Sequence, residues 1–347
     1  MENKKSYNAT IDYAKLIFAI LVVGIHTEPF GFNFWLDKSF GIVTRLCVPF
    51  FFVCSSFFYF SNEKVKNAKS YLWRLFVLFI IWSLIYLPFD RSFLKDKSTW
   101  EILEFYTWSG PSHALWYLSG SIMGFIIIIF LLRLLRMRKE YIFVISLCLL
   151  LIGCIITTYS PLFERLFSIC ISNDSDCRNG LFYAFPYMAL GMIIAKYHSM
   201  RKDVTDEMSI DEMTLARVPN NRFRLSGGGY FIGFIISTLV LCVESLFFVV
   251  VLKTNHTILW LSILPMTFFF FMWLLGLKIT RSREISLWMR KMSTLIFVSH
   301  GLFLMLFSRY FDNFMFFVVV TVTSAIFSHI IITLSRKRAF AFLVYLY

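Results

Sequence analysis

The sequence predicts an all-α protein of the membrane class, a polytopic transmembrane helical bundle with about ten spans. Its 347 residues are 58% hydrophobic and their mean hydropathy is +0.70, which is more apolar than a soluble domain requires. The apolar residues stand in runs of about 17–22, the length that a helix needs to cross a hydrocarbon core about 30 Å thick. Runs such as FIIIIFLLRLL also lack the alternation of membrane β-strands.

Ten segments are expected to cross the membrane, and together they make one membrane domain over 1–347. Each is an apolar run bounded by polar or basic residues. The longest connection, about 198–228, is polar and mixed in charge, and it is expected to be a loop on the inner side. In order, the expected spans are 11–30, 41–60, 72–89, 114–135, 141–159, 179–197, 229–252, 257–276, 292–309 and 314–335.

The distribution of Lys and Arg indicates which side is cytoplasmic. With the N-terminus inside, the inner segments hold 24 of the 34 cations and the outer segments hold 8, while Lys15 and Arg45 lie within spans. Cytoplasmic loops carry such an excess, so both termini are predicted to be cytoplasmic. The first apolar run has no small-residue cleavage site after it and is expected to remain as a span. The net charge of +13 follows from this topology and does not predict a nucleic-acid partner.

The seven cysteines do not indicate a metal site. They are scattered, without a CxxC pair or a Cys/His cluster of the kind that binds zinc, so no metal is expected. Cys170 and Cys177 flank the polar segment ISNDSD, and a disulfide between them is an open alternative if that loop faces an oxidising compartment.

The first span carries ionisable residues at two depths. Lys15 and His26 are eleven residues apart, which is within about 20° of three full helical turns, so they share one face about 16 Å apart along the axis. His26 is expected near the outer side, where a neutral imidazole suits general-base chemistry on a hydroxyl. The structural alternative for Lys15 is that it reaches the inner interface and pairs with Asp12. Glu28 lies close to His26 in sequence but points elsewhere, and an interface carboxylate is its alternative role.

The second span places Arg45 four residues inside its expected outer end, at a depth similar to that of His26. An arginine keeps its charge within a membrane, so it needs an anionic partner such as Glu28 or a substrate. Pro49 removes one helical hydrogen bond and is expected to kink this span.

Several short elements, in order, resemble the acyltransferase-3 family of integral membrane acyltransferases. They begin with the Lys15–His26 spacing, where the family more often has Arg at the first position, and with RLCVPFFFVCSSFF in the second span. The family often has R-x-x-R near the inner end of the third span; here Tyr71 precedes Arg74, and Lys69 is a candidate substitute for the missing cation. Further elements are HALWYLSGSI, CRNGLFYAFPYMALGMII, KMSTLIFVSH and SRKRAFAFLVYLY. The second and last of these resemble a branch that includes the membrane part of vancomycin-resistance-type serine racemases.

The resemblance implies a bacterial inner-membrane O-acyltransferase that moves acetyl from cytoplasmic acetyl-CoA to a hydroxyl of a surface glycan or lipid-linked glycan. O-antigen, capsule and exopolysaccharide are the expected acceptors. The inner cations Lys15, Arg74 and Lys69 are then expected to bind the donor phosphates. The expected catalytic residues are His26, Arg45 and Glu28, and the expected acceptor-binding residues are His113, Arg178 and His300.

Two other functions remain open on the sequence. Intramembrane Lys, His and Arg also suit a transporter or flippase for a small solute or lipid-linked sugar, a role that the racemase branch makes relevant. A glycan polymerase also has many spans, but that class tends to have one large outer loop rich in arginine, whereas the outer loops here are short. Oligomeric state is not readable from the sequence.

Overall fold

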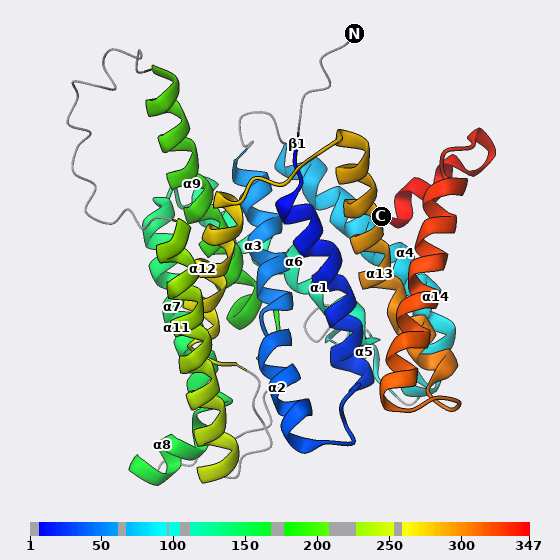
Figure 1. Ribbon diagram of the computed structural model, residues 1–347, viewed down its shortest axis with the longest axis horizontal. Coiled ribbons are helices and arrows are strands. Elements are labelled where there is room, and N and C mark those ends of the chain that lie inside the picture. Colours follow the sequence, from blue (N-terminus) through cyan, green and yellow to red (C-terminus); the bar gives the residue numbers. More distant parts are fainter. Residues whose placement is uncertain are drawn as a thin grey trace.

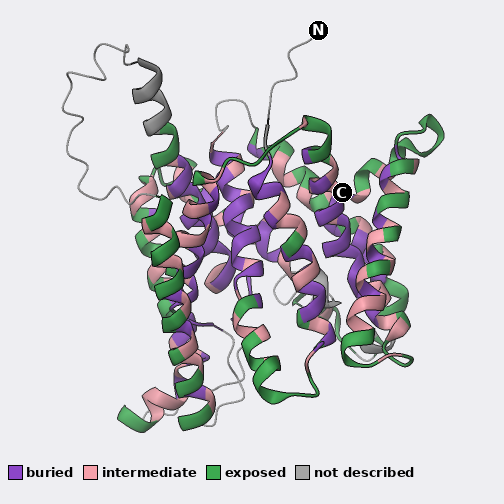
Figure 2. Cartoon of the chain, in the orientation of Figure 1, coloured by how far each residue is buried: buried purple, intermediate pink, exposed green. Residues whose placement is uncertain are grey.

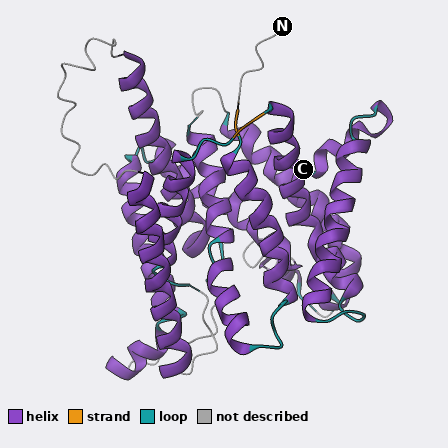
Figure 3. Ribbon diagram, in the orientation of Figure 1, coloured by secondary structure: helices purple, strands orange, loops and turns teal. Residues whose placement is uncertain are grey.

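The computed structural model describes residues 7–61, 67–95, 97–104, 112–167, 177–207, 227–252 and 259–347. Within these residues the chain is a bundle of roughly parallel and antiparallel helices, so the all-α prediction is confirmed (Figures 1 and 3). The strands found there are β1 (Tyr7–Asn8) and β2 (Thr280–Arg281), which form one short antiparallel pair. The helices are α1 (Thr10–Thr27), α2 (Phe34–Thr44), α3 (Cys47–Phe60), α4 (Ala68–Leu94), α5 (Thr99–Glu104), α6 (Ser112–Arg133), α7 (Lys139–Ile156), α8 (Ser160–Phe167), η2 (Gly180–Ala184), α9 (Phe185–Glu207), α11 (Gly227–Leu246), η3 (Phe247–Val251), α12 (Ile263–Gly276), α13 (Arg283–Phe307), α14 (Asn313–Leu334) and η4 (Arg338–Leu346).

Eight of the described helical stretches are long and apolar enough to cross a membrane. The two other predicted spans correspond to η2 with α9, and to α12, which has only 14 residues. The structure is therefore that of a multi-pass membrane protein, and the count of ten spans stays a prediction. The predicted inner loop is helical at its start, because α9 continues to Glu207; residues 208–226 lie outside the described part.

The second span is broken at Arg45 and Leu46, between α2 and α3. Pro49 has no N–H to donate to the carbonyl of Arg45, four residues earlier, so the helical ladder is interrupted there. The predicted kink is therefore confirmed. The expected outer end of the span was wrong, however, because α2 begins at Phe34 and places Arg45 eleven residues into the helical stretch. The side chain of Asn33 caps α2 by accepting from the backbone N–H of Trp35 and Leu36.

The buried centre of the bundle lies around α3 (Figure 2). Phe50 and Phe52 of this helix are fully buried. Gly191 lets α9 approach closely, because a Cβ there would collide with the carbonyl oxygen of Val53. Ser56 is also fully buried at this contact.

The peripheral helices turn apolar side chains outward. On α11, Ile232, Leu239 and Val243 are 60%, 60% and 68% exposed, which a soluble protein would not tolerate along one face. In a bilayer this surface meets lipid tails, so the pattern agrees with a membrane-embedded bundle.

The helices α1 and α13 pack together and run in the same direction. Asp12 of α1 contacts Arg290 of α13, and further along both helices His26 contacts His300. Spans that run the same way across a membrane differ by an even number in their order along the chain, which agrees with α1 as the first span and α13 as the ninth. At one end of the bundle lie β1 and η4 (Figure 1), the end that the charge distribution predicts to be cytoplasmic.

Candidate active site

Two histidines meet towards the predicted outer end of α1 and α13. The rings of His26 and His300 are stacked, with centroids 5.3 Å apart and an angle of 27° between their planes. His300 is completely buried, and His26 is half-buried. The structure thus brings together a predicted catalytic residue and a predicted acceptor-binding residue. A buried imidazole in a span is rarely incidental, since ionisable groups there usually serve function.

The orientation of His300 is set by its own helix. Its Nδ1 lies 2.7 Å from the carbonyl oxygen of Phe297, and a carbonyl only accepts, so we assign the hydrogen to Nδ1. In the neutral ring Nε2 then carries the lone pair. The neighbouring Gly301 allows α4 to pack against this turn, where the hydroxyl of Tyr86 donates to the carbonyl of Val298 at 2.8 Å.

Glu28, the third predicted catalytic residue, ends α1. It adopts a left-handed backbone conformation, with φ 46°, and its N–H donates to the carbonyl of Gly24 at 3.1 Å. The residue is exposed. A role as helix terminator accounts for its backbone, and a role in catalysis stays a prediction.

Arg45 lies in a second group, at the break between α2 and α3. Its guanidinium is 5.8 Å from the ring centroid of Trp260, within the range of a cation–π contact. Arg178 and Tyr183 are close enough to act on Arg45 electrostatically. The predicted acceptor residue Arg178 thus lies within electrostatic range of Arg45. The side chain of His113, at the start of α6, lies outside the described residues.

At the inner end of the same helices, the pairing differs from the sequence prediction. The buried carboxylate of Asp12 accepts from Nε of Arg290 at 2.7 Å, so in the described part of the chain Asp12 pairs with Arg290 and not with Lys15, as the structural alternative for Lys15 had it. Lys15 instead places Nζ 4.6 Å from the ring centroid of Phe58. The guanidinium of Arg290 lies 5.7 Å from the same ring. Two cations from different helices thus converge on one aromatic face.

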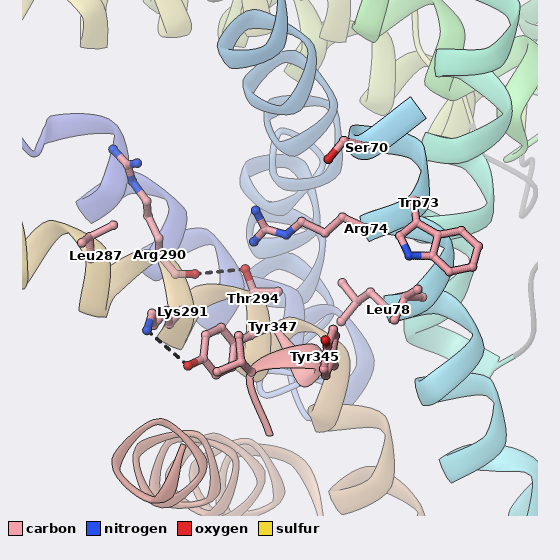
Figure 4. A pocket seen from close by; sticks show the side chains of 12 residues that line it. Ser70, Trp73, Arg74, Leu78, Leu287, Arg290, Lys291, Thr294, Tyr345 and Tyr347 are labelled. Atoms are coloured by element: carbon pink, nitrogen blue, oxygen red, sulfur yellow. Dashed lines mark hydrogen bonds between the residues drawn. The ribbon is translucent and has the colours of Figure 1, made fainter. Parts of the chain in front are cut away.

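A cavity of about 550 Å³ opens beside this cluster (Figure 4). Figure 4 shows Arg74 extending into it from α4, facing Lys291 and Thr294 of α13. Arg74 was predicted from sequence; Lys69 was predicted with it, but Lys69 is exposed and is not among the lining residues. The lining residues are Ser70, Trp73, Arg74, Val77, Leu78, Leu287, Arg290, Lys291, Thr294, Val344, Tyr345 and Tyr347.

The cations that join Arg74 at this cavity are Arg290 and Lys291. Both precede residue 292, the predicted start of the ninth span, and so fall in a predicted inner loop, whereas α13 begins at Arg283. The missed signal was Ser282, whose side chain caps the helix by accepting from the N–H of Ile285. Tyr71 stands at the position where the resemblance predicts a cation. Its hydroxyl forms a hydrogen bond with the hydroxyl of Ser55, so Tyr71 does not take over phosphate binding.

Aromatic side chains fill the space between the inner and outer ends. Phe51 of α3, Tyr117 of α6 and Phe297 of α13 contact one another with ring centroids 5.0–6.1 Å apart. Phe297 is also 6.1 Å from His300. Along α13, Phe297 of this aromatic cluster lies between Thr294, which lines the cavity, and His300.

The fold and the two polar ends define a multi-pass membrane protein with a cationic cavity on one side and a buried imidazole pair towards the other. Comparison of the sequence with models of known protein families identifies its family. The model of the acyltransferase-3 family, described as an acyltransferase domain, matches residues 8–335, and this chain belongs to that family. It is accordingly a membrane acyltransferase by family.

The chain is also similar to curated bacterial proteins that are longer than it is. It is 26% identical to an amino-acid racemase of Enterococcus faecalis over 94% of this chain and 46% of the relative. It is 24% identical to a serine/alanine racemase of Enterococcus gallinarum over 56% of this chain and 30% of the relative. The chain thus spans less than half the length of these relatives. No solved structure matches it.

Proposed function

We propose that this protein is an O-acetyltransferase of a bacterial inner membrane, which moves acetyl from cytoplasmic acetyl-CoA to a hydroxyl of a surface glycan or lipid-linked glycan. One observation supports the proposal above the others. The pair α1–α13 carries cations and a cavity at the predicted inner end and two histidines towards the outer end. A donor and an acceptor on opposite sides of a membrane would need such an arrangement.

The inner cavity suits the phosphates of coenzyme A. Arg74 and Lys291 line it from two different helices, and guanidinium groups bind phosphate oxygens through paired, charge-assisted hydrogen bonds. Arg290 also lines it, but its Nε is committed to Asp12. We therefore assign phosphate binding to Arg74 and Lys291, with Arg290 in the wall beside them; Lys15, also expected to bind the donor, is not among the residues that line the cavity.

The outer end suits the transfer step. His26 takes the proton from the acceptor hydroxyl, the hydroxyl oxygen attacks the thioester carbonyl, and the carbon–sulfur bond breaks to release the coenzyme A thiol after protonation. The products are an O-acetyl ester and free coenzyme A. His300 supports the ring of His26 by stacking on it. In this proposal Arg45 and Arg178 would orient the acceptor or stabilise the oxyanion.

The acetyl-bearing arm would have to pass the aromatic cluster of Phe51, Tyr117 and Phe297. Such rings can turn about their side-chain bonds without a change of fold, so donor binding is expected to be accompanied by their rearrangement. The proposal therefore includes an opening between α3, α6 and α13.

Membranes that contain the protein test this function when they are supplied with acetyl-CoA labelled in the acetyl group. Label should appear in glycan, and the variant His26→Ala should lose it at an unchanged protein level. Undiminished labelling in that variant would overturn the assignment of His26. Uptake of a solute such as serine, without any acetyl transfer, would instead favour the transporter.

A further inference from the structure

One wall of the inner cavity is made by the chain that follows α14. Val344, Tyr345 and Tyr347 line the cavity from η4 and the residue after it. Tyr345 is 63% exposed, whereas Tyr347 is 8% exposed and turned inward. This wall segment, residues 338–347, therefore covers a site whose other walls belong to α4 and α13.

A directed chain of hydrogen bonds holds Tyr347 against the cavity cation. Nζ of Lys291 lies 3.2 Å from the hydroxyl of Tyr347, and an ammonium group only donates, so the tyrosine oxygen accepts (Figure 4). The hydroxyls of Tyr347 and Ser335 are 2.9 Å apart, and that of Ser335 donates to the carbonyl of Ile332 at 2.8 Å. The only consistent direction is Lys291 to Tyr347 to Ser335 to Ile332.

Few other polar contacts hold the wall segment. The indole N–H of the buried Trp82 donates to the carbonyl of Leu346 at 3.1 Å. The segment itself is a 3-10 helix with a non-helical residue at Phe340. Such helices have poorer hydrogen-bond geometry than α-helices. The segment is thus attached at its end, through Leu346 and Tyr347, and is otherwise weakly constrained.

We propose that the wall segment is a displaceable gate of the donor site. In the closed gate the Tyr347 hydroxyl accepts a hydrogen bond from Lys291, and a phosphate group of the donor replaces that hydroxyl when the donor binds. The inference rests on the proposed function, since it takes the cavity as the place where the donor binds. A phosphate oxygen carries negative charge, so it attracts the ammonium group of Lys291 more strongly than the neutral hydroxyl oxygen of Tyr347, which accepts from it in this structure. The donor phosphate therefore replaces the Tyr347 hydroxyl as the hydrogen-bond partner of Lys291, and Tyr347 moves away from the cavity.

Binding of acetyl-CoA to the purified full chain tests the gate. Tyr347→Phe keeps the ring but removes the hydroxyl, so Lys291 is released and acetyl-CoA should bind about three- to tenfold more tightly. The matched control is Phe342→Leu, an exposed residue of the same segment that does not line the cavity, which should leave the affinity unchanged. Unchanged or weaker binding by Tyr347→Phe would overturn the gate.

A second measurement needs no substitution. Amide hydrogen exchange of residues 341–347 in the wild-type protein should become faster when acetyl-CoA is added, because the segment is released; unchanged or slower exchange would contradict the gate. Arg74→Gln and Lys291→Gln separate the two proposals. If both variants bind acetyl-CoA as the wild type does, the donor site itself is wrong; if both bind it less tightly while Tyr347→Phe is unchanged, only the gate is wrong.

Discussion

The two ends of the α1–α13 pair are built from different chemistry. The inner end holds permanent charges, with Asp12 bonded to Arg290 and a cavity open to Arg74 and Lys291. The outer end holds two stacked imidazoles, one of them fully buried. Full charges are stable where they are paired or reach water, whereas a group that can be neutral is tolerated deeper in the bundle. Under the proposed function, the inner end binds the donor and the outer end carries out proton transfer.

The largest expected effect is at His26. Replacement by Ala removes the proposed general base, so the rate of acetyl transfer should fall by about 10²–10⁴-fold. The rate with labelled acetyl-CoA on membranes measures this, together with protein level. The matched control is His329→Ala, which changes an exposed histidine of α14 and should leave transfer unchanged.

Arg290→Gln should mainly affect stability. It leaves the carboxylate of Asp12, which is 1% exposed, without this partner, and a buried acceptor that loses its hydrogen bond destabilises by about 1–3 kcal/mol. Thermal unfolding of the purified protein should show the loss. Arg283→Gln, on an exposed residue at the start of the same helix, is the control. Equal unfolding temperatures of the two variants would contradict the importance of the Asp12 pair.

His300→Gln should have a smaller effect on turnover than His26→Ala, about tenfold, because His300 acts through the ring of His26. If the two histidines form one unit, the double variant should transfer acetyl no more slowly than His26→Ala alone. A double variant whose rate falls by the product of the two single effects would show that the residues act independently.

The smallest effect is expected for Arg74→Gln. Arg74 is exposed to solvent, so the loss of its bond to phosphate should raise the KM for acetyl-CoA about five- to tenfold and leave kcat nearly unchanged. The neighbouring Lys69→Gln is the control and should leave the KM unchanged. A fall in kcat without a change in KM would contradict a role of Arg74 in donor binding and indicate a role in the transfer step.

The comparison of the two ends also shows what the sequence could predict. Helix periodicity places Lys15 and His26 on one face, and the apolar runs locate most helices, because both depend on local patterns. The contacts that α1 makes with other helices are distant in sequence. Asp12 and Arg290, for example, are 278 positions apart, and no local sequence pattern predicts such a contact. The depth of Arg45 was misjudged because α2 extends the second span on the outer side, where the sequence FWLDKSF is too polar to resemble a span.

Tyr347 illustrates the same limit at the cavity. Nothing in SRKRAFAFLVYLY distinguishes the last aromatic residue from the others in that stretch. Only the packing of η4 against α4 and α14 selects Tyr347 to face Lys291.

The sidedness of the donor tests the central claim most directly. Sealed inside-out and right-side-out membrane vesicles are each given labelled acetyl-CoA, which does not cross a bilayer. The account predicts acetylated glycan in inside-out vesicles alone, because the cavity with Arg74 and Lys291 then faces the added donor. Equal labelling in both preparations, or labelling in right-side-out vesicles alone, would contradict it.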